Sequence, residues 1–324
     1  MKILWFENRL GGEAYRYYWE MLANLKSRNG IDIRIIDNWN SKQYNVFNYE
    51  DFNYDADLIV FGFGVMNSGL NMDFMKINGA ENIPRVVILN KEYGIGTPEF
   101  NPSREPIFLE AKLKWTKEVA KPFVCFSYHH NYKDFESKTG IPFVNLPFGV
   151  NEKVFYDRNQ EYQWDVAFTG GTGKPRQQWS HSHRSMFFDE LQPELNSKGL
   201  STLFQPHMRD SSEEYCKKLC RAKIWLSTTG PLDIVGTRYF ELMVSNTTLL
   251  ICNRHEQAYE GILEEGVHCV MFDTKDELVE KIDYYLKNDD ERMKIVNSAY
   301  EHALKNHTYN SRANKFLEAI NEYK

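Results

Sequence analysis

The sequence predicts an α/β protein made of two doubly wound, Rossmann-like domains that face a cleft. Two observations support this fold class. Short apolar segments alternate with segments of helical period along the chain, and such alternation is typical of a mostly parallel sheet with helices on both faces. The length of 324 residues is sufficient for two domains with separate hydrophobic cores.

The first half of the chain supplies the first domain. A helix is expected over residues 13–28, because apolar and aromatic side chains recur on one face and Asn29-Gly30 follows as a helix end. Pro147 and Gly149 interrupt the pattern later, so we predict one domain over residues 1–150 and a second over residues 151–324. The last helix could pack back on the first domain. Strands are expected over residues 2–6, 31–36, 57–61, 85–90 and 123–127.

The second half repeats the alternation. Strands are expected over residues 164–169, 200–205, 223–227, 247–252 and 269–272. Helices are expected over residues 184–196, 213–221, 276–287, 290–305 and 311–323, with a further helix starting near residue 237. Ligands of doubly wound domains bind where strand carboxyl ends and helix N-termini meet, so we expect the site at that edge.

A glycine-rich loop, Gly170-Gly171-Thr172-Gly173, follows the strand expected over residues 164–169. Glycines at this place let the backbone approach a pyrophosphate closely, and Lys174 and Arg184 put positive charge nearby. The loop does not fit a P-loop, because Pro175 interrupts the helix start. The alternative interpretation is a plain flexible turn.

The strongest motif follows the strand expected over residues 223–227. A loop containing Gly and Pro leads into a helix starting at Gly236-Thr237-Arg238, and free amides at a helix start bind phosphate. Arg238 adds a cation whose forked donors match phosphate oxygens. Glu241 follows on the same face of an exposed helix start, where its carboxylate can accept two hydrogen bonds from ribose hydroxyls. The alternative is a helix-start threonine beside an Arg–Glu surface pair.

These motifs resemble the C-terminal domain of GT-B glycosyltransferases, and most closely the CgeB-like group of glycosyl transferases group 1. Members carry an Arg-x-Phe-Glu at the donor-site helix, here Arg238-Tyr239-Phe240-Glu241. They also have a Gly-containing stretch, here Gly170-Gly171, and a His-Thr-Tyr near the end, here His307-Thr308-Tyr309. The resemblance covers residues 146–312. It implies transfer of a hexosyl or pentosyl group from a nucleotide sugar to a glycan or other hydroxyl acceptor.

The resemblance also implies roles for single residues. Arg238 would bind the diphosphate of the donor, and Glu241 would hold its ribose. Retaining members of the wider fold place an acidic residue near the sugar, separated from this glutamate by seven residues. Asp233 stands there with a shorter side chain than the usual Glu, which puts its sugar contact and the retaining stereochemistry in doubt. The family's helix is usually followed by a small-residue pair, whereas this chain has Val244-Ser245-Asn246, in which Asn246 still suits a C-cap.

The first domain is expected to hold the acceptor. Gly11 and Gly12 form a turn before a helix, where an acceptor or phosphate loop would lie. Glu92 and His129 each follow a predicted strand at the presumed cleft edge, and either could act as general base on the acceptor hydroxyl if transfer inverts the anomeric centre. The alternative for His129, and for the adjacent His130, is polar surface.

Composition narrows the partners. The formal net charge of −6, without a basic stripe, argues against nucleic acid as the main partner. Five scattered cysteines indicate reduced thiols, and neither a signal peptide nor a stretch of roughly 20 apolar residues is visible, so we expect a cytoplasmic protein without membrane integration. Arg238, Lys174 and helix-start amides can stabilise a leaving diphosphate, so we expect neither a metal nor a cofactor besides the nucleotide sugar.

Three other functions remain open on the same fold. An epimerase would act on the nucleotide sugar alone and would need no acceptor pocket, and a phosphorylase would need a cofactor-binding lysine for which no signature is visible. A non-catalytic nucleotide- or sugar-binding protein would lack measurable donor hydrolysis.

Overall fold

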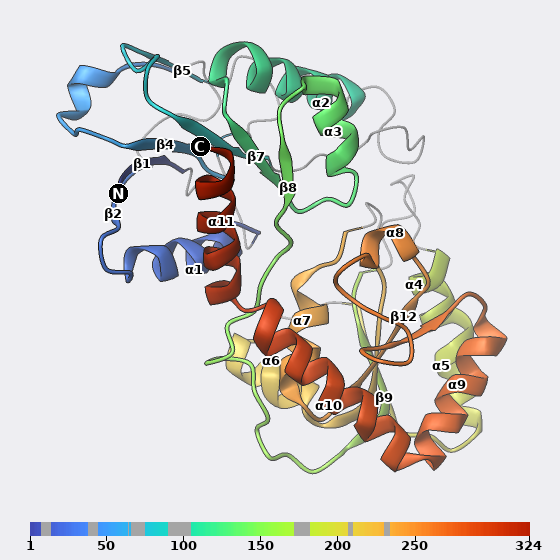
Figure 1. Ribbon diagram of the computed structural model, residues 1–324. Helices are drawn as coiled ribbons and strands as arrows, with labels where there is room; N and C mark the ends of the chain where they lie inside the picture. Colours follow the sequence, from blue (N-terminus) through green and yellow to red (C-terminus); the bar gives the residue numbers. More distant parts are fainter. Residues whose placement is uncertain are drawn as a thin grey trace. The chain divides into compact units, whose positions relative to one another are not determined.

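The computed structural model describes residues 1–7, 14–37, 45–63, 65, 75–89, 105–171, 182–206, 210–229 and 234–324. The chain divides into two compact units (Figure 1). Unit 1 comprises Met1–Pro147 and Arg312–Lys324, and unit 2 comprises Phe148–Ser311. The end of the chain therefore belongs to the unit that the first half of the chain builds.

Unit 1 contains, among its described residues, a six-stranded parallel sheet with the order β2-β1-β4-β6-β7-β8. A second, two-stranded parallel sheet pairs β3 (Asn45–Asn48) with β5 (Met75–Asn78). The strands of the large sheet are β1 (Lys2–Phe6), β2 (Asp32–Ile36), β4 (Leu58–Phe61), β6 (Arg85–Ile88), β7 (Val124–Ser127) and β8 (Phe143–Asn145). The strands β4 and β7, neither of which is at an edge of the sheet, are buried over their whole length, as expected for a parallel sheet covered on both faces.

The helices of unit 1 include the last helix of the chain. Phe316 of this helix is fully buried, with its ring 5.6 Å from that of Trp5 in β1 and 4.8 Å from that of Phe126 in β7. These helices are α1 (Ala14–Lys26), α2 (Glu105–Trp115) with a π-helical continuation (Thr116–Ala120), α3 (Tyr132–Thr139) and α11 (Tyr309–Tyr323), together with a 3₁₀ turn (Tyr49–Phe52). The chain terminus thus completes the hydrophobic core that the first strand begins.

Unit 2 is built on a five-stranded parallel sheet with the order β10-β9-β11-β12-β13. Its strands are β9 (Trp164–Thr169), β10 (Thr202–Gln205), β11 (Ala222–Ser227), β12 (Leu249–Asn253) and β13 (Val270–Phe272). Its helices are α4 (Ser182–Met186), a π-helical turn (Phe187–Leu191), α5 (Gln192–Ser197), α6 (Ser212–Leu219), α7 (Thr237–Ser245), α8 (Glu256–Tyr259), α9 (Lys275–Lys287) and α10 (Asp289–Asn306).

The unit 2 sheet has a hydrophobic core on each face. Along β11 the side chains alternate: Trp225 packs into one core with residues of α6, α7 and α10, while Ile224 and Leu226 pack into the other with residues of α5 and α9. This alternation follows from the two-residue period of a strand. The sheet is therefore doubly wound, as the sequence predicted.

Most expected elements are confirmed to within two or three residues. Residues 2–6 and 164–169 form the predicted strands without any shift. The helix expected over residues 184–196 is interrupted by the π-helical turn, and β3, β5, β8, α2, α3 and α8 were not predicted. Asn246 has φ 54° and ends α7 as the predicted left-handed C-cap.

The described helices include none that is both long and apolar enough to cross a bilayer. All five cysteines are buried as free thiols.

Candidate functional site

The candidate site lies at the carboxyl ends of β9 and β11 in unit 2, where α7 begins. Gly236 precedes α7 in an extended conformation, and among the described residues no side chain caps the helix start. The amide of Tyr239 donates to the carbonyl oxygen of Gly236 at 3.4 Å. The amides of Thr237 and Arg238 also lie in the first turn, and an anion is the acceptor that a helix N-terminus favours. Thr237 is the first residue of this helix, as expected.

Arg238 is fixed at the end of β9 by two hydrogen bonds. Its Nε donates to the Tyr215 hydroxyl at 2.8 Å, and its Nη1 donates to the carbonyl oxygen of Thr169. Burial acts to lower the pKa of Arg238, but the Tyr215 hydroxyl and the charge of Glu241 outweigh it, and the pKa is raised above its ordinary value. Arg238 is therefore a permanent cation beside the glycine loop.

Arg184 of α4 reaches the same place from the other side of β9. Its Nε donates to Thr228 Oγ1 at 2.8 Å and its Nη1 to the carbonyl oxygen of Gly171 at 3.2 Å. Burial, and after it the charge of Arg238, lower the pKa of Arg184 to about 10. Both guanidinium groups thus carry a proton at neutral pH, and the two like charges concentrate positive potential at one point.

Gly170 leaves no room for a side chain. A Cβ at this position would lie 2.9 Å from the ring of Phe168 and 3.6 Å from Arg184 Nη1. Its amide donates to the carbonyl oxygen of Gln205 at 3.0 Å, which fixes the start of the loop. Any larger residue here would therefore require the ring of Phe168 to shift, whereas the contact with Arg184 would be an ordinary one.

Glu241 is buried, with 7% of its surface exposed, and the expected exposed helix start is wrong. All residues from Tyr239 to Ser245 are buried, because both long sides of α7 pack into the core. The alternative of an Arg–Glu surface pair is therefore also wrong. Glu241 lies near enough to Arg238 for its charge to raise the pKa of the guanidinium group.

The loop after β11 is anchored to β12. The amide of Thr229 donates to Asn253 Oδ1 at 3.1 Å, and the Tyr259 hydroxyl lies 3.5 Å from the same oxygen. The Tyr259 hydroxyl is also 2.9 Å from that of Tyr239 in α7. A chain of polar contacts thus connects the start of α7 to the end of β12.

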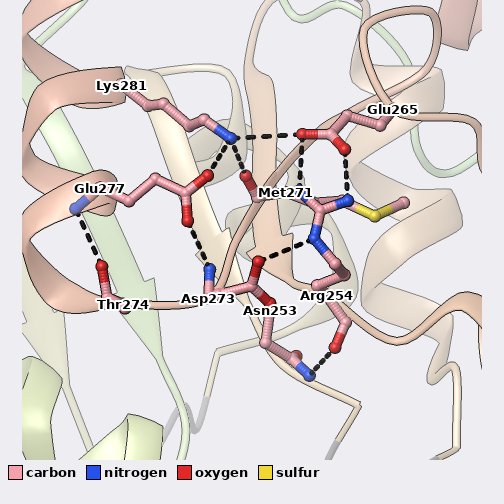
Figure 2. Close-up of polar contacts among 8 residues, drawn as sticks. All are labelled: Asn253, Arg254, Glu265, Met271, Asp273, Thr274, Glu277 and Lys281. Carbon is pink, nitrogen blue, oxygen red and sulfur yellow. Dashed lines mark hydrogen bonds and ion pairs between the residues drawn. The ribbon is translucent and has the colours of Figure 1, made fainter.

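A cluster of charged side chains fixes the ends of β12 and β13 (Figure 2). Arg254 Nε donates to Asp273 at 2.9 Å, and Arg254 Nη2 donates to Glu265 at 3.1 Å. Lys281 of α9 lies 3.2 Å from Glu265 and 2.6 Å from Glu277. The hydrogen bonds to Arg254 and Lys281 lower the pKa of Glu265, although burial opposes this.

His129 occupies the end of β7 in unit 1. It is only 6% exposed, so the polar-surface alternative is wrong for this residue. Its amide donates to Ser127 Oγ at 3.0 Å, its Nδ1 accepts from the amide of Asn131 at 3.1 Å, and its ring stacks on that of His130. Because Nδ1 accepts this bond, the proton of the neutral ring lies on Nε2, which is a hydrogen-bond donor rather than the basic nitrogen.

Five of the expected site residues lie outside the described residues: Gly11, Gly12, Glu92, Lys174 and Asp233. Sequence reasoning missed three contributors, Tyr215, Thr228 and Asn253. Thr228 and Asn253 stand at the ends of predicted strands, which is a usable signal for a ligand edge. Nothing in the local sequence marks Tyr215.

Within the described part of the chain, no three His, Cys, Asp or Glu side chains are grouped as around a metal ion. The chain contains one Asp-x-Asp sequence, Asp55-Ala56-Asp57, just before β4. Asp57 Oδ2 accepts from the amide of Lys2 at 2.7 Å, and this bond lowers the pKa of its carboxyl group. This pair therefore lies at the amino end of the unit 1 sheet, opposite to its carboxyl edge.

Residues 160–318 match a protein family described as glycosyl transferase-like. The matched segment includes α7, the glycine loop and both arginines. No curated protein sequence matches this chain.

Many solved structures share the fold of this chain, and three of them are described here. HepE of Anabaena in complex with UDP is 13% identical at a TM-score of 0.64, over 99% of this chain and 100% of HepE. Sucrose-phosphate synthase from Thermosynechococcus elongatus is 11% identical at a TM-score of 0.62, over 99% of this chain and 98% of the synthase. An α-glucosyltransferase in complex with UDP-glucose and DNA containing an abasic site is 12% identical at a TM-score of 0.57, over 99% of this chain and 99% of that enzyme. The predicted GT-B fold is thereby confirmed, and the CgeB-like group stays a prediction.

Proposed function

We propose that this chain is a glycosyltransferase that moves a sugar from a nucleotide-sugar donor to a hydroxyl acceptor. The observation that carries the proposal is the convergence of Arg184 and Arg238 on the end of β9, beside the uncapped start of α7. Two guanidinium groups and a helix N-terminus form a receptor for a diphosphate. The match of residues 160–318 to a glycosyl transferase-like family supports the same conclusion.

Each part of the donor has a proposed contact in unit 2. The diphosphate lies against Arg184, Arg238 and the backbone of Gly170-Gly171, and the ribose hydroxyls donate to the carboxylate of Glu241. Asp233 stands near the sugar. UDP-glucose is the first donor to test, because HepE and the α-glucosyltransferase of similar fold hold UDP or UDP-glucose.

The chemistry requires stabilisation of a leaving group. The bond between the anomeric carbon and the phosphate oxygen breaks, the acceptor oxygen bonds to that carbon, and negative charge grows on the departing diphosphate. Arg184, Arg238, Lys174 and the α7 amides stabilise this charge without a metal ion. A base, Glu92 or His129, accepts the proton of the acceptor hydroxyl if the reaction inverts the anomeric centre.

The proposal is tested by incubating the protein with UDP-glucose and the glucose conjugates of GDP, ADP and dTDP, and measuring release of the nucleoside diphosphate. Release from one donor, accelerated by an acceptor and unchanged by EDTA, is the expected result. Loss of activity with EDTA would overturn the metal-free chemistry. An isomerised donor sugar without release would identify an epimerase instead. Tight binding of a donor without any turnover would favour a binding protein of the same fold.

A further inference from the structure

The two arginines of the candidate site contact the protein in the same way. In each, Nε donates to a side-chain hydroxyl at 2.8 Å, Tyr215 for Arg238 and Thr228 for Arg184. In each, Nη1 donates to a carbonyl oxygen at the end of β9, that of Thr169 or Gly171. Among the described residues neither Nη2 has a recorded acceptor. Since a guanidinium group has five N–H donors, both hydrogens of Nη2 and one of Nη1 have no acceptor within the described part of the chain.

We propose that Tyr215 and Thr228 are positioning residues, whose hydroxyl groups hold Arg238 and Arg184 so that both Nη2 atoms face the diphosphate of the donor. The inference rests on the proposed function and adds to it two residues that act through the arginines. Neither hydroxyl group needs to touch the donor itself.

Tyr215 is suited to this role because it lies on a rigid element. Its ring packs edge-on against Phe155 at 6.0 Å and Trp225 at 6.3 Å, at the margin of the core that includes α6 and α7. Ser211 caps the start of α6 by accepting from the amide of Glu214 at 3.2 Å. Aromatic packing fixes both side-chain torsions of a tyrosine, so its hydroxyl group has a defined place.

Thr228 is equally constrained. It is buried directly after β11, and the amide of the next residue, Thr229, is bound to Asn253 at 3.1 Å. A β-branched side chain on a fixed backbone has few rotamers. The hydroxyl group of Thr228 therefore meets Arg184 without a further loss of conformational freedom.

Such restraints have a clear physical purpose. Two guanidinium groups in one place repel each other, and without acceptors behind them they would move apart into solvent. A hydroxyl oxygen behind each Nε offsets part of this repulsion before the donor arrives, and a preorganised pair binds a diphosphate without reorganisation.

The test compares Tyr215→Phe and Thr228→Val with the parent by calorimetric titration of UDP and of uridine, which lacks the diphosphate. We expect each variant to bind UDP on the order of tenfold more weakly and uridine as well as the parent does. A merely structural role would weaken both ligands alike, and equal losses for UDP and uridine would overturn the inference.

Matched controls remove a tyrosine and a threonine hydroxyl group at positions of unit 2 outside the candidate site. Tyr162→Phe removes a hydroxyl group that donates to the carbonyl oxygen of Thr247 at 2.8 Å, and Thr202→Val removes one that donates to Asn196 at 2.9 Å. Both controls should bind UDP like the parent.

A double variant tests whether Tyr215 acts through Arg238. In the Arg238→Ala background, Tyr215→Phe should cause no further loss of UDP affinity, whereas Thr228→Val should still cause one because it acts through Arg184. If Tyr215→Phe and Thr228→Val both bind UDP as tightly as the parent does, only this inference is overturned. A parent that binds no nucleoside diphosphate would overturn the proposed function as well.

Discussion

Arg184 lies close enough to Arg238 for the two positive charges to repel each other: burial and, after it, this neighbouring charge lower the pKa of Arg184 to about 10. Both side chains still carry a proton at neutral pH. A bound diphosphate would place negative charge between them and relieve the repulsion. This relationship is what the proposed diphosphate site requires of the pair.

Arg184→Gln should therefore weaken UDP binding by about tenfold or more, because one charge-assisted contact to the diphosphate is lost. The melting temperature of the ligand-free protein should change little, since relief of repulsion offsets the lost bonds to Thr228 and Gly171. Thermal unfolding with and without UDP measures both quantities. Arg221→Gln, which removes a guanidinium group bound to Gln160, is the control. If UDP raised the melting temperature of Arg184→Gln as much as that of the parent, the proposed role of Arg184 in diphosphate binding would be wrong.

Glu241→Ala should remove the preference of the protein for UDP over its 2′,3′-dideoxy analogue. The proposed contact of Glu241 is to the ribose hydroxyls, so the variant should lose UDP affinity and keep its affinity for the analogue. Competition binding with the two nucleotides gives the ratio directly. An unchanged ratio would show that Glu241 acts only through the charge of Arg238.

Glu265→Gln should lower the melting temperature at pH 7 and lose this effect in acid. The folded pKa of Glu265 is lowered by its bonds to Arg254 and Lys281. Its contribution to stability is therefore present above its unfolded pKa, about 4.3, and is lost as the pH falls through the lower folded value. Solvent screening limits the effect to about 1 kcal/mol or less. Melting curves from pH 7 to pH 3 test this, with the exposed Glu280→Gln as control. If the difference in melting temperature between Glu265→Gln and the parent stayed the same from pH 7 to pH 3, the ionised Glu265 carboxylate would not be the source of this stability.

Phe316→Ala should lower the free energy of unfolding of unit 1 by about 3–5 kcal/mol, because a fully buried aromatic ring is removed from its contacts with Trp5 and Phe126. Tyr323→Ala in the same helix, where 41% of the residue surface is exposed, should have little effect. Urea titration compares the two variants. If they are equally stable, α11 does not complete the core of unit 1.

The sequence predicted those elements whose signal is local. Residues 164–169 are a mostly apolar run followed by glycines, and β9 has these bounds. The strands β3 and β5 were missed because each has four residues with polar positions, and they are defined by pairing with each other across some 30 residues. Such pairing leaves no mark within either segment.

The candidate site was partly predictable for the same reason. Arg238 and Asn246 were found because a glycine begins the helix and an asparagine ends it. The burial of Glu241 was not, because it depends on the packing of α7 into the core rather than on its neighbours in sequence. Tyr215 was not found because it is 23 residues from Arg238 and meets it only after α6 has packed.

The most direct test of the central claim is a crystal structure of the protein with UDP. We expect the diphosphate at the start of α7, with its oxygens within hydrogen-bonding distance of Nη2 of both Arg184 and Arg238. A nucleotide bound elsewhere, with both guanidinium groups facing solvent, would contradict it.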